Sequence, residues 1–483
     1  MANQWNPNMS PYRQDRSSCI PVLLIIFVLT LGIGGGIYFF VNNVMNEAFE
    51  SSITQVSSQM ETAVVGGSGA NEPAIAGSVL YSSTQLAYDR NGDERNELLV
   101  QITSNNKYSM ALLDGADGKP IWQTELGSES YELVALDKYV AVIKERDFRL
   151  FNSQDGTFGW QTRLTDRLQS NPPMVFIADD LLVIQTYDNI LTAYELKTGS
   201  QRWQKTLEAS YASDLVRLGD ELCGTERDAE SLEFVVCYAL KTGEQRQAIQ
   251  LNNDWTEQVE WIADPLNNDG ILRLQSDPEP ITLSAIGLDQ QQRWSVELDE
   301  AFYYSFRGSE QRFANSSDSL AIGAEQHIAI ITAERKVVMY SLTDYALTPL
   351  GFDNDVLYVS AVKQRGTNTV SILAINAQTA ELIWRLDDLG ESHEWSGSGK
   401  IQGVVVPGEG MIFGWLDPEI DDLVRVQLLK RQDGTVGWSF QQQMFIGQVP
   451  VLTRTGNALL IQTSDGLAMT NLRTGESLWT LTR

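Results

Sequence analysis

The sequence predicts an all-β protein, an eight-bladed β-propeller of four-stranded blades preceded by one N-terminal transmembrane helix. Three observations lead to this fold class. A hairpin motif ending in tryptophan recurs through most of the chain, the segments between its copies have the apolar patterning of short strands, and an uncharged apolar stretch lies near the N-terminus. Seven or nine blades are the alternatives.

The apolar stretch runs from Cys19 to Val41 without a charged side chain, which is long enough to cross a bilayer as a helix. Arg13 and Arg16 precede it, and no Lys or Arg follows until Arg90. Because positive charge collects on the cytoplasmic side, we expect the N-terminus in the cytoplasm and the rest of the chain on the extracytoplasmic side, periplasmic or cell-surface.

Four segments follow from this topology. A short amphipathic stalk is expected after the span, and the stretch from Gly66 to Pro73 is typical of a flexible linker. We therefore expect a cytoplasmic tail at residues 1–18, a transmembrane helix at 19–41, a stalk and linker at 42–74 and a propeller at 75–483.

The hairpin motif is best preserved from Ala193 to Trp203. An alternating strand stops at Lys-Thr-Gly, where Gly199 can supply the positive φ of a tight turn, and a new strand begins. Copies recur at intervals of about 40–45 residues, the length of one four-stranded blade. Those with a tryptophan end at Trp122, Trp160, Trp203, Trp294, Trp384, Trp438 and Trp479.

These tryptophans are expected to be structural docking residues, since a large flat ring at a fixed place in the outer strand can wedge between neighbouring blades. A copy ending at Gln247 keeps the turn without tryptophan, and a degenerate copy is expected to begin at Met339. Nine candidate units result. Residues 345–352 would have to close one unit and open the next, so we expect eight full blades.

The motif A-x-[DEN]-x-x-T-G-x-x-x-W resembles the tryptophan-docking repeat of pyrroloquinoline-quinone-like propellers. That superfamily includes quinoprotein alcohol dehydrogenases and the propeller lipoprotein of the bacterial outer-membrane assembly machine. The resemblance covers roughly residues 80–483 and is specific for fold rather than activity. The enzymes carry a disulfide between adjacent cysteines against the cofactor, whereas Cys223 and Cys237 are far apart in this sequence, so no pyrroloquinoline quinone is expected.

Composition excludes some functions. The formal net charge is −28, from 35 basic and 63 acidic residues, which is opposite in sign to what a nucleic-acid binder needs. Only two histidines, His327 and His393, are present, which leaves little material for a zinc site or a His-based relay. No catalytic set is found, and we expect a protein that is not an enzyme.

Cys223 and Cys237 flank a hairpin turn. If they are cross-strand partners, residues 225 and 235 also pair, as do 227 and 233, and a five-residue tip remains. A disulfide between them suits an extracytoplasmic domain. The alternative, given equal weight, is that the two cysteines are unbonded and act as small buried hydrophobic residues.

A second candidate site is the acidic loop Asp89-Arg-Asn91-Gly-Asp93-Glu-Arg-Asn-Glu97. Oxygen ligands from Asp89, Asn91, Asp93 and Glu97 suit Ca²⁺, and the loop resembles the calcium loops of integrin-type propeller repeats. It departs from them at Glu94, where they have glycine, and at Glu97, where they have aspartate. A structural Ca²⁺ that stabilises the first blade and a metal-free acidic turn are both compatible with this pattern.

Two functions follow. The first is a membrane-anchored, extracytoplasmic propeller that serves as a protein-interaction or assembly scaffold. The second is a ligand-binding receptor or enzyme that holds a quinone- or sugar-type ligand in the central funnel. The expected partners are proteins, with the membrane bound through the N-terminal helix.

Overall fold

The computed structural model separates residues 1–69 from residues 70–483 as two units, and the following description concerns the second. It describes residues 78–482 except 169–174, 208–215, 228–232, 251–256, 261–269, 276–279, 288, 290, 303–312, 364–368, 388, 390–402, 417–422, 444–449 and 464–465. The predicted tail, transmembrane helix, stalk and linker lie outside these residues. In the part that is described, no helix has the length and hydropathy needed to cross a membrane.

The described residues form nine four-stranded sheets, each made of four strands that are consecutive in the sequence. They are called blades 1 to 9 in chain order. Blades 1 to 3 contain β1 (Ser78–Leu86), β2 (Leu98–Ser104), β3 (Lys107–Leu113), β4 (Pro120–Gly127); β5 (Glu132–Leu136), β6 (Tyr139–Lys144), β7 (Asp147–Asn152), β8 (Phe158–Arg163); and β9 (Val175–Ala178), β10 (Leu181–Gln185), β11 (Ile190–Glu195), β12 (Gln201–Thr206).

Blades 4 to 6 contain β13 (Val216–Leu218), β14 (Glu221–Arg227), β15 (Glu233–Ala239), β16 (Gln245–Gln250); β17 (Glu257–Glu260), β18 (Gly270–Gln275), β19 (Ile281–Gly287), β20 (Gln292–Leu298); and β21 (Phe313–Asn315), β22 (Ser319–Ala324), β23 (His327–Thr332), β24 (Val337–Ser341). Blades 7 to 9 contain β25 (Tyr345–Asp353), β26 (Val356–Lys363), β27 (Val370–Asn376), β28 (Leu382–Leu386); β29 (Gly403–Val406), β30 (Gly410–Leu416), β31 (Leu423–Lys430), β32 (Val436–Gln443); and β33 (Val451–Thr455), β34 (Ala458–Gln462), β35 (Gly466–Asn471), β36 (Ser477–Thr482).

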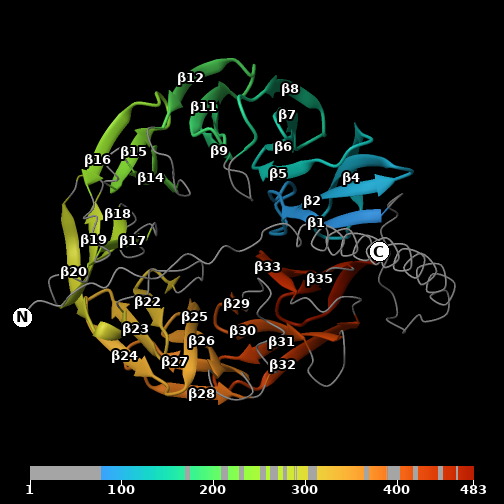
Figure 1. Ribbon diagram of the computed structural model, residues 1–483. Helices are drawn as coiled ribbons and strands as arrows, with labels where there is room; N and C mark the ends of the chain where they lie inside the picture. The colour runs from blue at the N-terminus through green and yellow to red at the C-terminus, as the bar shows by residue number, and fades with distance from the viewer. Residues whose placement is uncertain are drawn as a thin grey trace, which may run out of the picture. The chain divides into compact units, whose positions relative to one another are not determined.

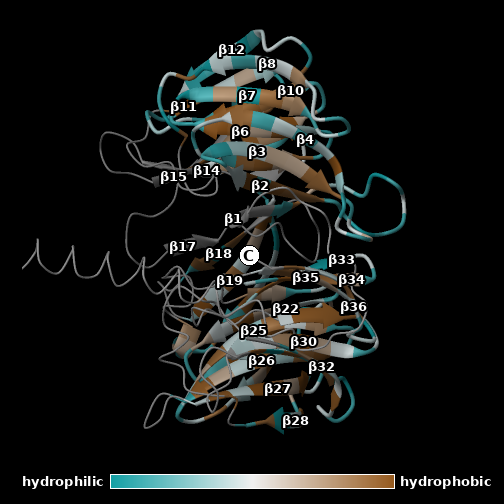
Figure 2. Ribbon diagram, turned by 90° about the vertical axis from the view of Figure 1, so that its right-hand side faces the viewer, coloured by the Kyte–Doolittle hydropathy of each residue, from teal (hydrophilic) through white to brown (hydrophobic). Residues whose placement is uncertain are grey.

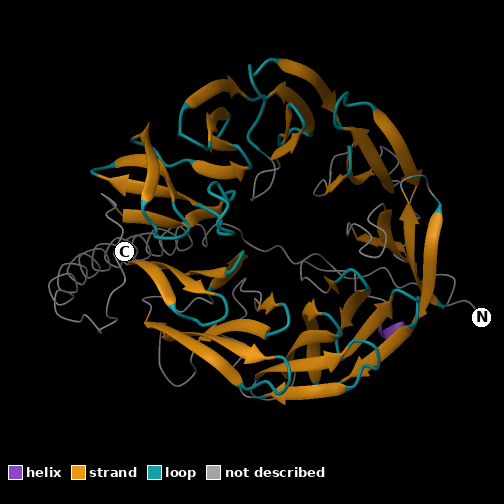
Figure 3. Ribbon diagram, turned by 180° about the vertical axis from the view of Figure 1, so that it is seen from behind, coloured by secondary structure: helices purple, strands orange, loops and turns teal. Residues whose placement is uncertain are grey.

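The blades follow one another around a ring (Figure 1), and clusters of buried apolar side chains join neighbouring blades. One cluster combines Leu98 and Val100 of blade 1 with Leu460 and Trp479 of blade 9, so the last blade packs on the first. Strands dominate the described chain, and η2 (Glu300–Phe302), one turn of 3₁₀ helix, is the sole helix there (Figure 3).

Burial explains the strand sequences. The second strand of a blade lies between two neighbouring blades, so both of its faces are apolar, and all five residues of β10 are buried. The outer strand has one face in solvent, so β20 alternates between exposed and buried residues after its first residue. Hydrophilic residues gather at the turns that end the blades (Figure 2).

The prediction of eight blades is wrong, because the structure has nine four-stranded sheets in its described residues. The sixth blade opens with β21, a strand of three residues that alternation in the sequence does not reveal. The strand at His327 is therefore third in its blade, and β24 closes that blade at Ser341. β25 then opens blade 7 alone, so no segment serves two blades.

The prediction that a copy of the motif begins at Met339 is also wrong, because Met339 lies at the end of a copy. Met339 lies in β24 and pairs with Ala329, as Trp203 pairs with Ala193 in blade 3. Methionine thus occupies the tryptophan position of the sixth blade, and the motif of that blade runs from Ala329 to Met339. The repeat keeps its regular spacing in blade 6, but methionine replaces the tryptophan that marks the repeat in other blades.

Candidate functional site

The tryptophans of the motif connect each blade to the next. The indole Nε1 of Trp160 in β8 donates a hydrogen bond to the Leu196 carbonyl oxygen at 2.7 Å, just after β11 of blade 3. Five more indoles make the equivalent bond to the following blade: Trp122 to Ser153, Trp203 to Leu240, Trp384 to Arg431, Trp438 to Leu472 and Trp479 to Gly115. Trp294 lies beneath the guanidinium of Arg335, 4.8 Å from the ring centroid.

The turn glycine of one blade lies against the tryptophan of the blade before it. Gly199 has φ +70°, and a Cβ there would lie 2.6 Å from Cδ2 of Trp160. Gly156, Gly243, Gly434 and Gly475 have the same relation to Trp122, Trp203, Trp384 and Trp438. The glycine therefore allows both the left-handed turn and the close approach of the ring.

The acidic loop of residues 89–97 lies where blade 1 meets blade 9. The backbone N–H of Asn96 donates to Oγ1 of Thr455 at 2.5 Å, and Nε of Arg95 donates to Oδ1 of Asn457 at 3.2 Å. A Cβ on Gly456 would collide with the Glu94 carbonyl, so the loop and the β33–β34 turn are in close contact. The loop thus helps to join the last blade to the first.

The four predicted calcium ligands accept hydrogen bonds inside their own loop. Asp89 accepts from the N–H groups of Gly92 and Glu94, at 2.7 and 2.9 Å. Asn91 and Asp93 accept from backbone N–H groups two residues further on, and Glu97 Oε2 accepts from the Arg90 N–H at 2.9 Å. Calcium binding stays a prediction, with carboxylate and amide oxygens of the right chemistry for the ion.

Glu97 offers a test of that prediction. It is 1% exposed, and burial raises the pKa of its carboxyl above 4.5 in spite of the Arg90 hydrogen bond. Ionisation of Glu97 therefore lowers the free energy of unfolding. This loss is absent at pH values below the pKa of Glu97 in the unfolded chain, and it is complete at pH values above its pKa in the folded chain. Without calcium, Glu97→Gln should be at least as stable as the wild type at pH 7 in thermal unfolding, and this advantage should shrink towards pH 4. If Ca²⁺ binds, it should raise the Tm of the wild type but not of Glu97→Gln.

Cys223 and Cys237 are directly opposite in β14 and β15, with Cα atoms 4.1 Å apart and their sulfur atoms bonded. Thr225 pairs with Val235 and Arg227 with Glu233, which is the register that the spacing predicts. The side chains of both cysteines are buried. They lie inside blade 4.

The outer strands of blades 6 to 8 carry four exposed apolar side chains that sequence reasoning missed. They are exposed by 37–47% and lie in β24, β28 and β32, which follow one another along the rim (Figure 1): Met339, Leu382, Ile383 and Val436. We call these four residues the apolar rim. The position two residues before the tryptophan gives a partial signal in the sequence: it is Leu382 or Val436 here and Gln201 or Gln292 in blades 3 and 5, but it is also apolar in blade 2, where Phe158 is exposed by 54%.

These features define a β-propeller whose blades are joined by tryptophan-docking hairpins. Residues 94–221 match the family model described as outer membrane protein assembly factor BamB. No curated protein sequence matches the chain.

Many solved structures are similar, and three illustrate the range. A crystal structure described as the eukaryotic initiation factor is 12% identical, with TM-score 0.52 over 77% of this chain and 90% of that chain. BamB from Moraxella catarrhalis is 17% identical, with TM-score 0.41 over 77% and 98%. Quinohemoprotein alcohol dehydrogenase ADHIIG from Pseudomonas putida HK5 is 14% identical, with TM-score 0.35 over 73% and 66%. At 12% identity, the similarity to the initiation-factor structure shows a shared fold and nothing more.

Proposed function

We propose that this chain is a membrane-anchored, extracytoplasmic scaffold that binds protein partners along the apolar rim of blades 6 to 8. The observation that carries the proposal is the exposure of Leu382 by 45% and of Ile383 by 40% on β28, the edge strand of blade 7. Exposed apolar side chains beside unpaired backbone groups favour association with another chain. The match of residues 94–221 to an assembly-factor family supports the same reading.

The partner chemistry that fits this edge is an extended segment with apolar side chains. Such a segment can add to β28 as a further strand, with main-chain hydrogen bonds for affinity and side-chain contacts for specificity. A bulge in β28 leaves Ile383 without a cross-strand partner on β27, because Ala374 pairs with Trp384 and Ile375 with Leu382. Both exposed side chains are thus available to a partner.

Replacing Leu382 and Ile383 together with serine should abolish partner binding without unfolding the propeller, because both side chains are exposed. The matched control replaces Gln201 and Arg202 with serine, at the same two positions of β12 in blade 3, where both residues are also exposed. The tethered full chain would be crosslinked in its membrane and the partner recovered quantitatively from each variant. Hydrogen exchange should show slower amide exchange in β28 when the partner is bound. Equal recovery from both variants would contradict the rim as the binding surface.

The competing function, a receptor or enzyme with a quinone- or sugar-type ligand in the central funnel, has a direct test. The full chain would be incubated with pyrroloquinoline quinone and Ca²⁺, and dye-linked alcohol oxidation would be measured. The scaffold proposal expects neither stoichiometric quinone binding nor turnover. Binding with turnover would replace it with the enzyme reading.

A further inference from the structure

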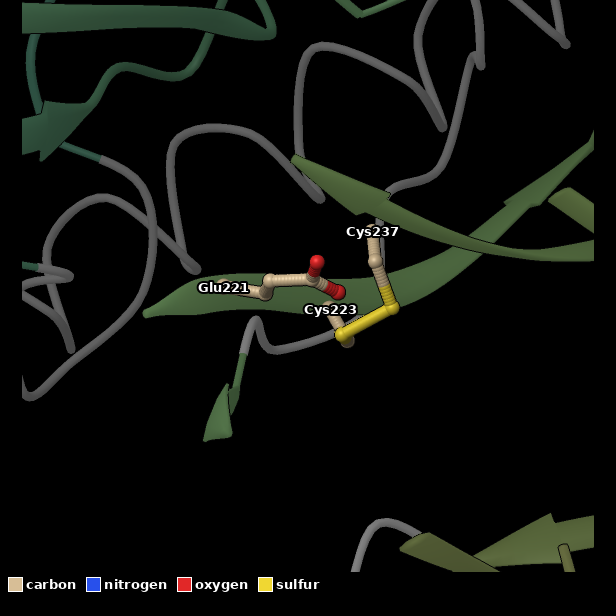
Figure 4. Close-up of side chains that lie close together, drawn as sticks. All are labelled: Glu221, Cys223 and Cys237. Carbon is tan, nitrogen blue, oxygen red and sulfur yellow. A yellow bond between two sulfur atoms is a disulfide. The ribbon is translucent and has the colours of Figure 1, made fainter. Parts of the chain in front are cut away.

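Three potential metal ligands lie together inside blade 4 (Figure 4). Glu221 and Cys223 are two residues apart in β14 and so project from the same face, and Cys237 is directly opposite Cys223 in β15. One potential ligand atom from each lies within 4.8 Å of the other two, and the three residues are exposed by 8%, 0% and 1%. Among the described residues, this is the one group of three His, Cys, Asp or Glu side chains so arranged.

Glu221 is the second observation that points to a ligand. Its Oε1 faces Nη1 of Arg246 at 3.3 Å, whereas Oε2 is buried and has no hydrogen-bond partner among the residues that the structure describes. An unpaired carboxylate oxygen away from water destabilises a fold. The pair with Arg246 leaves Oε2 free to bind a cation while it holds the carboxylate in place, as outer partners of metal ligands commonly do.

We propose that the reduced form of this cluster binds one Zn²⁺ through the thiolates of Cys223 and Cys237 and the carboxylate of Glu221. In the oxidised protein the two sulfur atoms are joined and no thiolate is present. A dithiol or phosphine reductant supplies two electrons, the S–S bond breaks, and two protons give two thiols. Zn²⁺ then displaces both protons and forms two Zn–S bonds and one Zn–O bond.

The ligand set determines the class of cation. Thiolates favour Zn²⁺ over Mg²⁺ and Ca²⁺, and a carboxylate oxygen is an ordinary third zinc ligand. Three protein ligands leave the fourth position of a tetrahedral ion to water. The cluster is therefore a redox-dependent zinc site, because the same sulfur atoms form either the disulfide or the metal bonds.

The test uses the purified full chain after reduction with a phosphine and removal of excess reductant without oxygen. Co²⁺ reports thiolate ligation through its charge-transfer absorption, and competition with Zn²⁺ measures affinity. The variant Cys19→Ser removes the remaining cysteine and should bind one equivalent with unchanged affinity, whereas Cys223→Ser should lose the thiolate signal. Glu221→Gln should weaken Zn²⁺ binding by roughly tenfold or more. The oxidised protein should show no thiolate ligation.

Each remaining outcome overturns the proposal. A reduced chain that keeps its β-sheet circular dichroism but shows no thiolate–Co²⁺ absorption has no such site. A reduced chain that unfolds contradicts it too, because the site requires the paired strands. Zn²⁺ binding that Glu221→Gln leaves unchanged assigns the ion to the cysteines alone and removes Glu221 from the site.

Discussion

Replacing Trp479 with alanine is expected to lower the free energy of unfolding of the propeller by about 3–5 kcal/mol, the range typical of a buried aromatic residue. Trp479 is 1% exposed, and its Nε1 donates to the Gly115 carbonyl oxygen at 3.0 Å. Its ring belongs to the cluster that joins blade 9 to blade 1. The alanine variant therefore leaves a cavity and an unpaired carbonyl where the ring of blades closes.

The closing contact has no support from strand pairing. β1 to β4 form one sheet and β33 to β36 another, so no described strand is shared between the ends of the propeller. No strand pairing and no stretch of chain joins blade 9 to blade 1 in the described residues, whereas the chain itself connects every other pair of neighbours. We therefore expect Trp479→Ala to increase proteolysis of blades 1 and 9 as well as to lower stability.

Denaturant unfolding of the full chain measures this effect, with two comparison variants. Trp203→Ala should cost less, because Trp203 is only partly buried and its two blades are covalently consecutive. Phe158→Ala removes a ring that is 54% exposed and should change stability by about 0.5 kcal/mol or less. If Trp479→Ala resembles Phe158→Ala, the indole does not hold the ring closed.

Replacing Gly199 with alanine should have the second large effect. The φ of +70° costs a residue with a Cβ about 1–2 kcal/mol. The added methyl group would lie 2.6 Å from Trp160, and displacing the ring should cost about 1–3 kcal/mol more. Gly219→Ala separates the two contributions, because Gly219 has φ +60° with nothing within 4 Å of the added Cβ.

A double-mutant cycle identifies the ring as the cause. With Trp160 already replaced by alanine, the Gly199→Ala change should cost no more than Gly219→Ala, so the two losses should be less than additive. Full additivity would show that Gly199 acts through its turn alone. The same unfolding measurements provide all four values.

The pairing of tryptophan with glycine accounts for one departure of the motif from its pattern, at blades 6 and 7. Met339 replaces the tryptophan of blade 6, and in the turn of blade 7 Ala380 has φ +57° in place of glycine. Blade 4 has Gln247 at its tryptophan position, and the motif of blade 5 lacks the turn glycine. The Cβ of Ala380 is tolerated because Met339, not an indole, occupies the tryptophan position of blade 6. The turn of blade 6 also lacks glycine, and there Arg335 has φ +64° and lies over Trp294 of blade 5. The loss of a tryptophan and the loss of a turn glycine are each visible in the sequence. Only the circular arrangement of the blades shows that the turn of one blade lies against the tryptophan position of the blade before it.

The candidate sites were predictable to different degrees. The register of Cys223 and Cys237 follows from a short antiparallel hairpin, in which the distance from the tip sets every pair. The third member of their cluster, Glu221, could have been suspected from its i, i+2 spacing, but its unpaired buried oxygen depends on the packing of blade 4. The apolar rim depends on β24, β28 and β32 being consecutive outer strands, which a misplaced sixth blade conceals.

The sequence by itself determined the repeating four-stranded unit, its turn and its docking tryptophan, because strand alternation, a left-handed glycine and a buried indole are local requirements repeated in nearly every unit. It did not determine the count of nine, since β21 has only three residues and Met339 replaces the marker of its blade. The tertiary structure decided how the chain closes on itself, with the loop of residues 89–97 bonded to Thr455 and Trp479 bonded to Gly115. Contacts between residues hundreds of positions apart follow from the geometry of a closed ring, and no local pattern encodes them.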